Sequence, residues 1–134
     1  MNSRKILKKI IPIVLVGLLL TSCGSFSMQS AGGQEAKVTG VEVIVAESFP
    51  PQYFAVAIGQ LPDGCTEIDG ATQTVQARTI KITLTTTRPN DAMCTTAVQP
   101  FKENIPINVD GLSAGQYTIE VNGVPVNLNL TEDY

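Results

Sequence analysis

The chain has 134 residues, enough for one domain once processing segments are set aside. It contains no histidine and no tryptophan. Without histidine, a Ser-His-Asp triad and a cysteine–histidine nucleophile are excluded, and we expect no enzyme, no metal site and no cofactor. Beyond residue 22 there are five basic and twelve acidic side chains, a net charge of −7. This charge repels phosphate backbones, so we expect no nucleic-acid partner.

The first 22 residues have the pattern of an export signal. A polar start with four basic residues is followed by an apolar run from Ile10 to Leu20, interrupted by Pro12 and Gly17. A membrane-spanning helix needs about 20 apolar residues, and this run is much shorter. The pattern therefore predicts a signal peptide over residues 1–22 rather than an uncleaved anchor helix.

The residues that end the leader are more specific. Leu20-Thr21-Ser22-Cys23 places an aliphatic residue and two small residues before a cysteine. This segment resembles the lipobox of bacterial lipoproteins. The resemblance implies a lipid on the Cys23 sulfur, cleavage between Ser22 and Cys23 by signal peptidase II, and acylation by fatty acids such as palmitate. Two or more acyl chains hold a protein stably on a membrane. The expected location is the extracytoplasmic side of the cell membrane or the outer membrane; the alternative is a secreted protein with a chance cysteine at its cleavage site.

Residues 23–37 are rich in Gly, Ser and Gln and show no apolar periodicity, which predicts a flexible linker. The remainder, residues 38–134, is the predicted folded domain. Its apolar residues recur with a period of two, as in β-strands. Strands are predicted around residues 41–46, 54–58, 66–75, 79–87, 105–109, 117–121 and 124–130. In the clearest one, residues 79–87, Ile80, Ile82 and Leu84 alternate with threonine and lysine.

Two turns define the last strands. Asn122-Gly123 separates two alternating runs and predicts a two-residue hairpin turn. Pro125 lacks an N–H and is expected at a position without a ladder hydrogen bond or on an edge strand. Before the first run, the segment from Gly111 to Tyr117 resembles the tyrosine corner of immunoglobulin-like and fibronectin-like domains, in which the hydroxyl bonds the backbone upstream. The sequence thus predicts an all-β fold, an immunoglobulin-like or fibronectin-like antiparallel sandwich of about seven strands, and resembles the single-domain modules of uncharacterised bacterial lipoproteins.

The chain has three cysteines. If Cys23 bears lipid, Cys65 and Cys94 remain as a pair in an oxidising compartment. A hairpin formed by residues 66–75 and 79–87 would bring them to the same end of the domain, so we expect a disulfide. Two free thiols and a metal site with two sulfur ligands are the alternatives.

Four acidic residues lie near this predicted disulfide: Asp63, Glu67, Asp69 and Asp91. Their oxygens could bind calcium or act as an acid and base pair, but their spacing matches no known calcium loop. We therefore expect a non-catalytic binding module whose disulfide-linked loops present the binding surface to an unidentified protein or envelope ligand. Protease inhibition is a variant of the hypothesis of a binding module. The alternative is a structural spacer or assembly accessory of the cell envelope. The sequence leaves the oligomeric state open.

Overall fold

The structure of the chain is a computed structural model that describes residues 33–134. Over this range the chain forms strands and no helix, and therefore no helix that could cross a membrane. The eight strands are β1 (Gln34–Glu35), β2 (Lys37–Ala46), β3 (Gln52–Leu61), β4 (Glu67–Gln76), β5 (Thr79–Thr87), β6 (Gln99–Ile107), β7 (Gly115–Val121) and β8 (Val124–Leu130).

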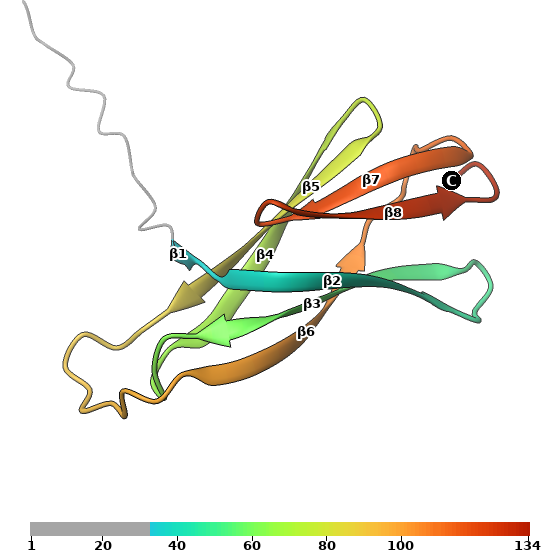
Figure 1. The fold of residues 1–134 in the computed structure, drawn as a ribbon. Helices are drawn as coiled ribbons and strands as arrows, with labels where there is room; N and C mark the ends of the chain where they lie inside the picture. Colours follow the sequence, from blue (N-terminus) through green and yellow to red (C-terminus); the bar gives the residue numbers. More distant parts are fainter. Residues whose placement is uncertain (1–32) are drawn as a thin grey trace, which may run out of the picture.

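The strands form two sheets, shown in Figure 1. Sheet A has five strands: β4 lines one edge of β5, and β1 and β7 share the other, with β8 beyond β7. Sheet B has three strands in the order β2-β3-β6. The predicted all-β sandwich is confirmed. One pairing departs from the predicted antiparallel arrangement, because β5 and β7 run parallel while the other pairs are antiparallel.

The core between the sheets follows the alternation of sheet A. Ile80, Ile82 and Leu84 of β5 are buried, with Ile119 and Val121 of β7 beside them. The threonine and lysine residues between them on β5 face away, as predicted for a half-buried strand. Removing this apolar surface from water stabilises the domain by roughly 25 cal/mol per Å².

Strand β3 presents its small residues to the core. Ala55 and Ala57 belong to the core cluster between the sheets, whereas Val56 is buried but lies outside that cluster. Because successive side chains alternate across a strand, Phe54 and Ile58 share the outer face of sheet B with Val56. Gly59 shows how closely the inner face is packed: a Cβ there would lie 2.6 Å from the ring of Phe101. Phe54, Val56 and Ile58 therefore point out of the sandwich, whereas Tyr53, the largest residue of this strand, faces the core.

The predicted Asn122-Gly123 hairpin is confirmed. Both residues have positive φ, 46° and 85°, as the two central positions of a type I′ turn require. The Asn122 side chain also enters the sheet: its Oδ1 accepts from the Leu84 N–H, and its Nδ2 donates to the carbonyl oxygens of Leu84 and Ala36, each at 2.8 Å. The carboxamide thus occupies the gap on the β5 edge between β1 and β7.

The segment that precedes β2 differs from the prediction. Residues 34–37 belong to the predicted linker, yet β1 pairs with Thr85 and Thr86 of β5, and Ala36 is only 4% exposed. The Ala36 N–H donates to the Leu84 carbonyl at 2.9 Å. The composition of this segment is typical of a linker, but the free edge of β5 supplies hydrogen-bond partners that composition cannot reveal. The folded domain therefore begins by Gln34.

Two further local predictions are confirmed. The Tyr117 hydroxyl donates to the Ser113 carbonyl at 3.0 Å, which is the bond of a tyrosine corner. The Arg78 guanidinium lies 5.2 Å from the Tyr117 ring centroid and covers it in a cation–π contact. Pro125 lies on β8, an edge strand of sheet A.

Candidate functional site: the disulfide-linked loops

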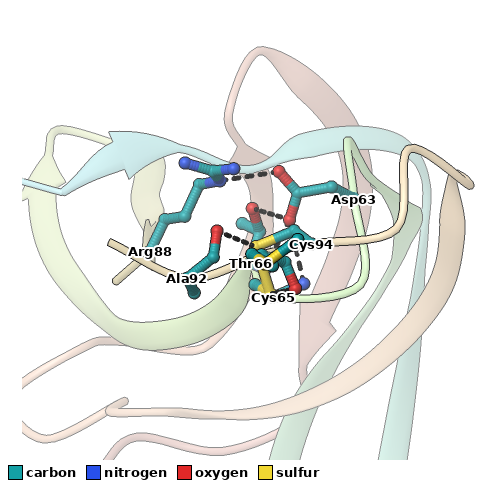
Figure 2. Close-up of a disulfide and its surroundings, with 7 residues drawn as sticks. Asp63, Cys65, Thr66, Arg88, Ala92 and Cys94 are labelled. Carbon is teal, nitrogen blue, oxygen red and sulfur yellow. Dashed lines mark hydrogen bonds and ion pairs between the residues drawn. A yellow bond between two sulfur atoms is a disulfide. The ribbon is translucent and has the colours of Figure 1, made fainter. Parts of the chain in front are cut away.

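A disulfide joins the two loops at one end of the sandwich, as predicted. Cys65 lies in the connection from β3 to β4, Cys94 lies in the connection from β5 to β6, and their Cα atoms are 5.5 Å apart. Figure 2 shows the bond with its surroundings. The Cys94 sulfur also lies 3.3 Å from the Ala92 carbonyl oxygen, although an oxidised sulfur has no proton to donate. A second link crosses the loops, because the Gly64 N–H donates to the Thr95 carbonyl at 3.2 Å.

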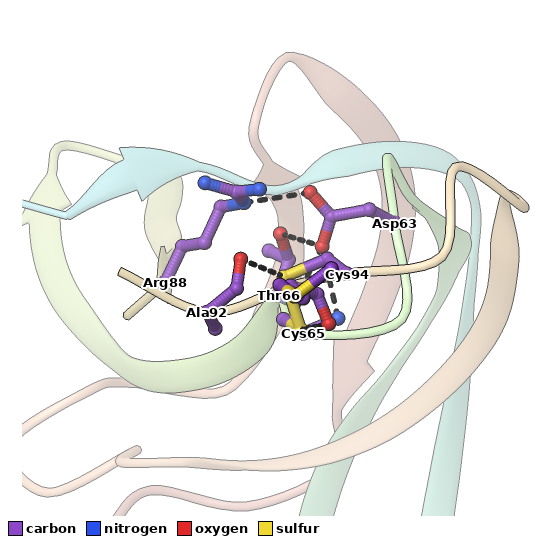
Figure 3. A network of polar contacts seen from close by, with 7 residues as sticks. Asp63, Cys65, Thr66, Arg88, Ala92 and Cys94 are labelled. Carbon is purple, nitrogen blue, oxygen red and sulfur yellow. Dashed lines mark hydrogen bonds and ion pairs between the residues drawn. A yellow bond between two sulfur atoms is a disulfide. The ribbon is translucent and has the colours of Figure 1, made fainter. Parts of the chain in front are cut away.

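Asp63 organises the turn that carries Cys65. Its Oδ1 accepts from the backbone N–H groups of Cys65 at 2.9 Å and Thr66 at 2.8 Å, and from the Thr66 hydroxyl at 2.9 Å. Its Oδ2 accepts from Arg88 Nε at 2.7 Å. Figure 3 shows this network, in which one carboxylate joins both loops. Asp63 therefore has a structural role beside the disulfide.

The electrostatics of Asp63 agree with this role. Burial acts to raise the pKa of its carboxyl group, but the Arg88 guanidinium and the donors from Cys65 and Thr66 outweigh burial and lower the pKa to about 2. The group is therefore ionised at neutral pH, which suits an acceptor of four hydrogen bonds and not a proton donor in catalysis.

The other acidic residues considered above do not join Asp63 in a site. Between Gly33 and Tyr134 there is no group of three or more His, Cys, Asp or Glu side chains placed to hold a metal ion. Asp63 already uses both oxygens within the protein.

The start of the described chain lies at this same end of the molecule. Gln34 pairs with Thr86, next to the end of β5, in the same part of Figure 1 as the two loops. A hollow of about 380 Å³ separates this segment from the loops and is lined by residues that include Gln34, Leu61, Pro62 and Val98. The opposite end holds the β2–β3 hairpin and Tyr134, whose hydroxyl lies 2.9 Å from that of Tyr53.

Comparison with known families identifies the domain. The model of the ORF11 beta-sandwich domain matches residues 55–131, more than half of the chain. The chain belongs to the ORF11 beta-sandwich domain family. The match begins within β3 and includes both cysteines of the disulfide and the Asn122-Gly123 turn.

This ORF11 domain is similar to small proteins of Herpetosiphon aurantiacus. One, an uncharacterised 10.2-kDa protein in the HgiCIIM 5′ region, is 44% identical over 93 residues, which are 69% of this chain and 98% of the relative. Two others, in the HgiBIM and HgiEIM 5′ regions, are each 47% identical over 83 residues, which are 62% of this chain and 100% of the relative. No solved structure shows a significant match.

The sequence-predicted residues have different outcomes in this ORF11 domain. Cys65 and Cys94 are brought together, whereas Ser22 and Cys23 lie outside the described residues. The ion pair between Asp63 and Arg88 was not predicted, although Asp63-Gly64 has the composition of a turn whose carboxylate bonds the backbone.

Proposed function

We propose that this chain is an exported lipoprotein, held on a membrane through lipid on Cys23, and that its ORF11 sandwich is a non-catalytic binding module. The basic start, the short apolar run and Leu20-Thr21-Ser22-Cys23 support the anchoring step. The observation that supports a fixed, oriented module is the attachment of β1. Its two residues pair with β5, and Asn122 bonds the adjacent Ala36, so the tether enters a rigid domain at Gln34.

This attachment orients the domain. Ten residues separate Cys23 from Gln34, and the linker predicted for them from composition would reach roughly 17 Å. The disulfide-linked loops lie at the end where the tether enters and therefore lie nearest the membrane. Under this proposal the loops that we expected to present the binding surface lie against the bilayer. The surface available to a partner is the opposite end, where Phe49 at the tip of the β2–β3 hairpin is fully exposed.

Metabolic labelling with palmitate tests the anchor. Wild-type protein is expected to carry the label and to fractionate with membranes, and Cys23→Ala is expected to lose both properties. The matched control is Cys65→Ala with Cys94→Ala, which removes the two other cysteines and should keep the label. Unchanged labelling and membrane retention of Cys23→Ala would refute the anchor.

Site-specific photo-crosslinking in intact cells tests the binding module. Within residues 33–134, two apolar side chains are fully exposed, Phe49 and Met93, and they lie at opposite ends of the domain. A photoreactive residue at Ser48, beside Phe49, is expected to give a discrete protein adduct that Phe49→Ser abolishes. The same probe at Met93, on the membrane side, should give no such adduct. If the probe at Ser48 also gives no adduct, the hypothesis of a binding module is refuted and the spacer role is favoured.

A further inference from the structure

The outer face of sheet B carries an apolar patch whose central residue, Val56, is already covered within one chain, whereas the residues around it are partly or fully exposed. On the central strand β3, Phe54, Val56 and Ile58 point out of the sandwich. In register with Phe54 lie Ile44 on β2 and Pro106 on β6. We call these five residues the sheet-B patch. Ile44 is 47% exposed, and Pro106 is exposed as well.

The other sheet shows what an ordinary outer face looks like in this protein. On β5 of sheet A, the residues that face away from the core are Thr79, Lys81, Thr83 and Thr85. An antiparallel sheet with one solvated face usually alternates apolar inward and polar outward in this way. On β3 the outward positions hold Phe54, Val56 and Ile58 in place of polar residues, while the inward positions hold Tyr53 and small residues such as Ala55. The composition of the sheet-B patch therefore resembles that of a surface that is covered.

The charged residues at the two edges of the patch favour a second copy of this chain as its partner. Glu42 on β2 lies in register with Val56, and Lys102 on β6 lies in register with Ile58, two residues further along β3. Both side chains are exposed and belong to outward-facing positions. The patch thus has an acid at one edge and a base at the other. A surface with this arrangement complements itself when β2 of one copy lies over β6 of another.

We propose that the sheet-B patch joins two copies of this chain as a two-fold dimer. The orientation of the dimer rests on the proposed lipid anchor. Two copies on one membrane stand the same way up, so their two-fold axis is perpendicular to the membrane. The strands run from the tethered end to the opposite end and so lie roughly along that axis. This rotation lays β2 over β6 and brings Glu42 of each copy near Lys102 of the other.

Zero-length carbodiimide crosslinking of the full chain in membranes tests the dimer, because it joins a carboxylate to an amine only where the two touch. We expect a dimer band that contains a Glu42–Lys102 crosslinked peptide. Lys81 and Glu120 are in register on β5 and β7 of one chain, and their link within the monomer controls for reagent activity. A dimer band that is absent while the control link forms would overturn the proposal.

Charge reversal tests the same contact independently. Glu42→Lys or Lys102→Glu replaces two exposed attractive pairs by repulsive ones in the dimer, and we expect about tenfold weaker association. The double variant restores opposite charges and should restore the dimer. Equal dimer yield in wild type and both single variants would refute the arrangement. Palmitate labelling without a dimer would refute the patch alone, whereas a dimer without labelling would refute the anchor alone.

Discussion

Replacement of Asn122 tests how β1 is held on the sandwich. In Asn122→Ala, the Leu84 N–H and the Ala36 carbonyl lose the partner that the carboxamide gives them. A part-buried polar group without a partner costs about 1–3 kcal/mol. In this variant the Leu84 carbonyl still accepts a hydrogen bond from the Ala36 N–H. Alanine at φ 46° adds a steric cost of about 1–2 kcal/mol. The expected loss of unfolding free energy is about 3 kcal/mol, or roughly 12–24 °C in Tm.

Chemical denaturation of the purified protein measures this loss, and Asn122→Gly separates its two causes. Glycine removes the same hydrogen bonds but tolerates positive φ, so its loss should be about 1 kcal/mol smaller than that of alanine. Hydrogen exchange should show faster exchange at Ala36 in both variants, because β1 loses a contact that holds it on β5. A loss below about 0.5 kcal/mol for Asn122→Ala would refute the role assigned to the carboxamide.

Three further predictions concern stability. Removing the disulfide by Cys65→Ala with Cys94→Ala should lower the unfolding free energy by about 3.5 kcal/mol, because the bond closes a loop with a sequence separation of 29. Reduction of the wild type should lower it by a similar amount. A loss near zero would contradict the loop-entropy argument. The folded pKa of Asp63, about 2, is below its ordinary 3.8. Its contribution is therefore complete above about pH 4 and is lost as pH falls toward 2, so acid denaturation should be shallower in that window for Asp63→Asn. Tyr117→Phe should lower the unfolding free energy by about 1 kcal/mol in urea, because the Ser113 carbonyl loses its donor; an unchanged midpoint would mean that water replaces the hydroxyl.

The strands of this domain were predictable because alternation, turn residues and β-branched side chains indicate the same elements. Residues 79–87 are predicted and observed with the same bounds. The Asn122-Gly123 turn was predictable because few residues adopt positive φ at both central positions. The disulfide followed from the hairpin that brings its two cysteines to one end.

Other features depend on contacts between distant segments. Alternation on β3 indicates a strand but does not say which set of side chains faces the core; that choice depends on how closely Phe101 and β2 approach Gly59. The parallel pairing of β5 with β7 leaves no local pattern in either strand. The side chain of Asn122 bonds Ala36, which is 86 residues away in sequence. Local sequence patterns cannot specify such a pair.

The bond between Asn122 and Ala36 has a consequence for the order of folding. Synthesis makes the N-terminal part of a chain first, so β1 is present long before the residues that complete its position. Until the β7–β8 turn has formed, the edge of β5 lacks the carboxamide that bonds Ala36 and Leu84. Contacts of such large sequence separation form slowly because a long loop must close first. The first strand of this domain is therefore among the last to gain all of its hydrogen bonds. In a chain that ends before Asn122, the segment of β1 would lack the hydrogen bond that Asn122 gives to Ala36.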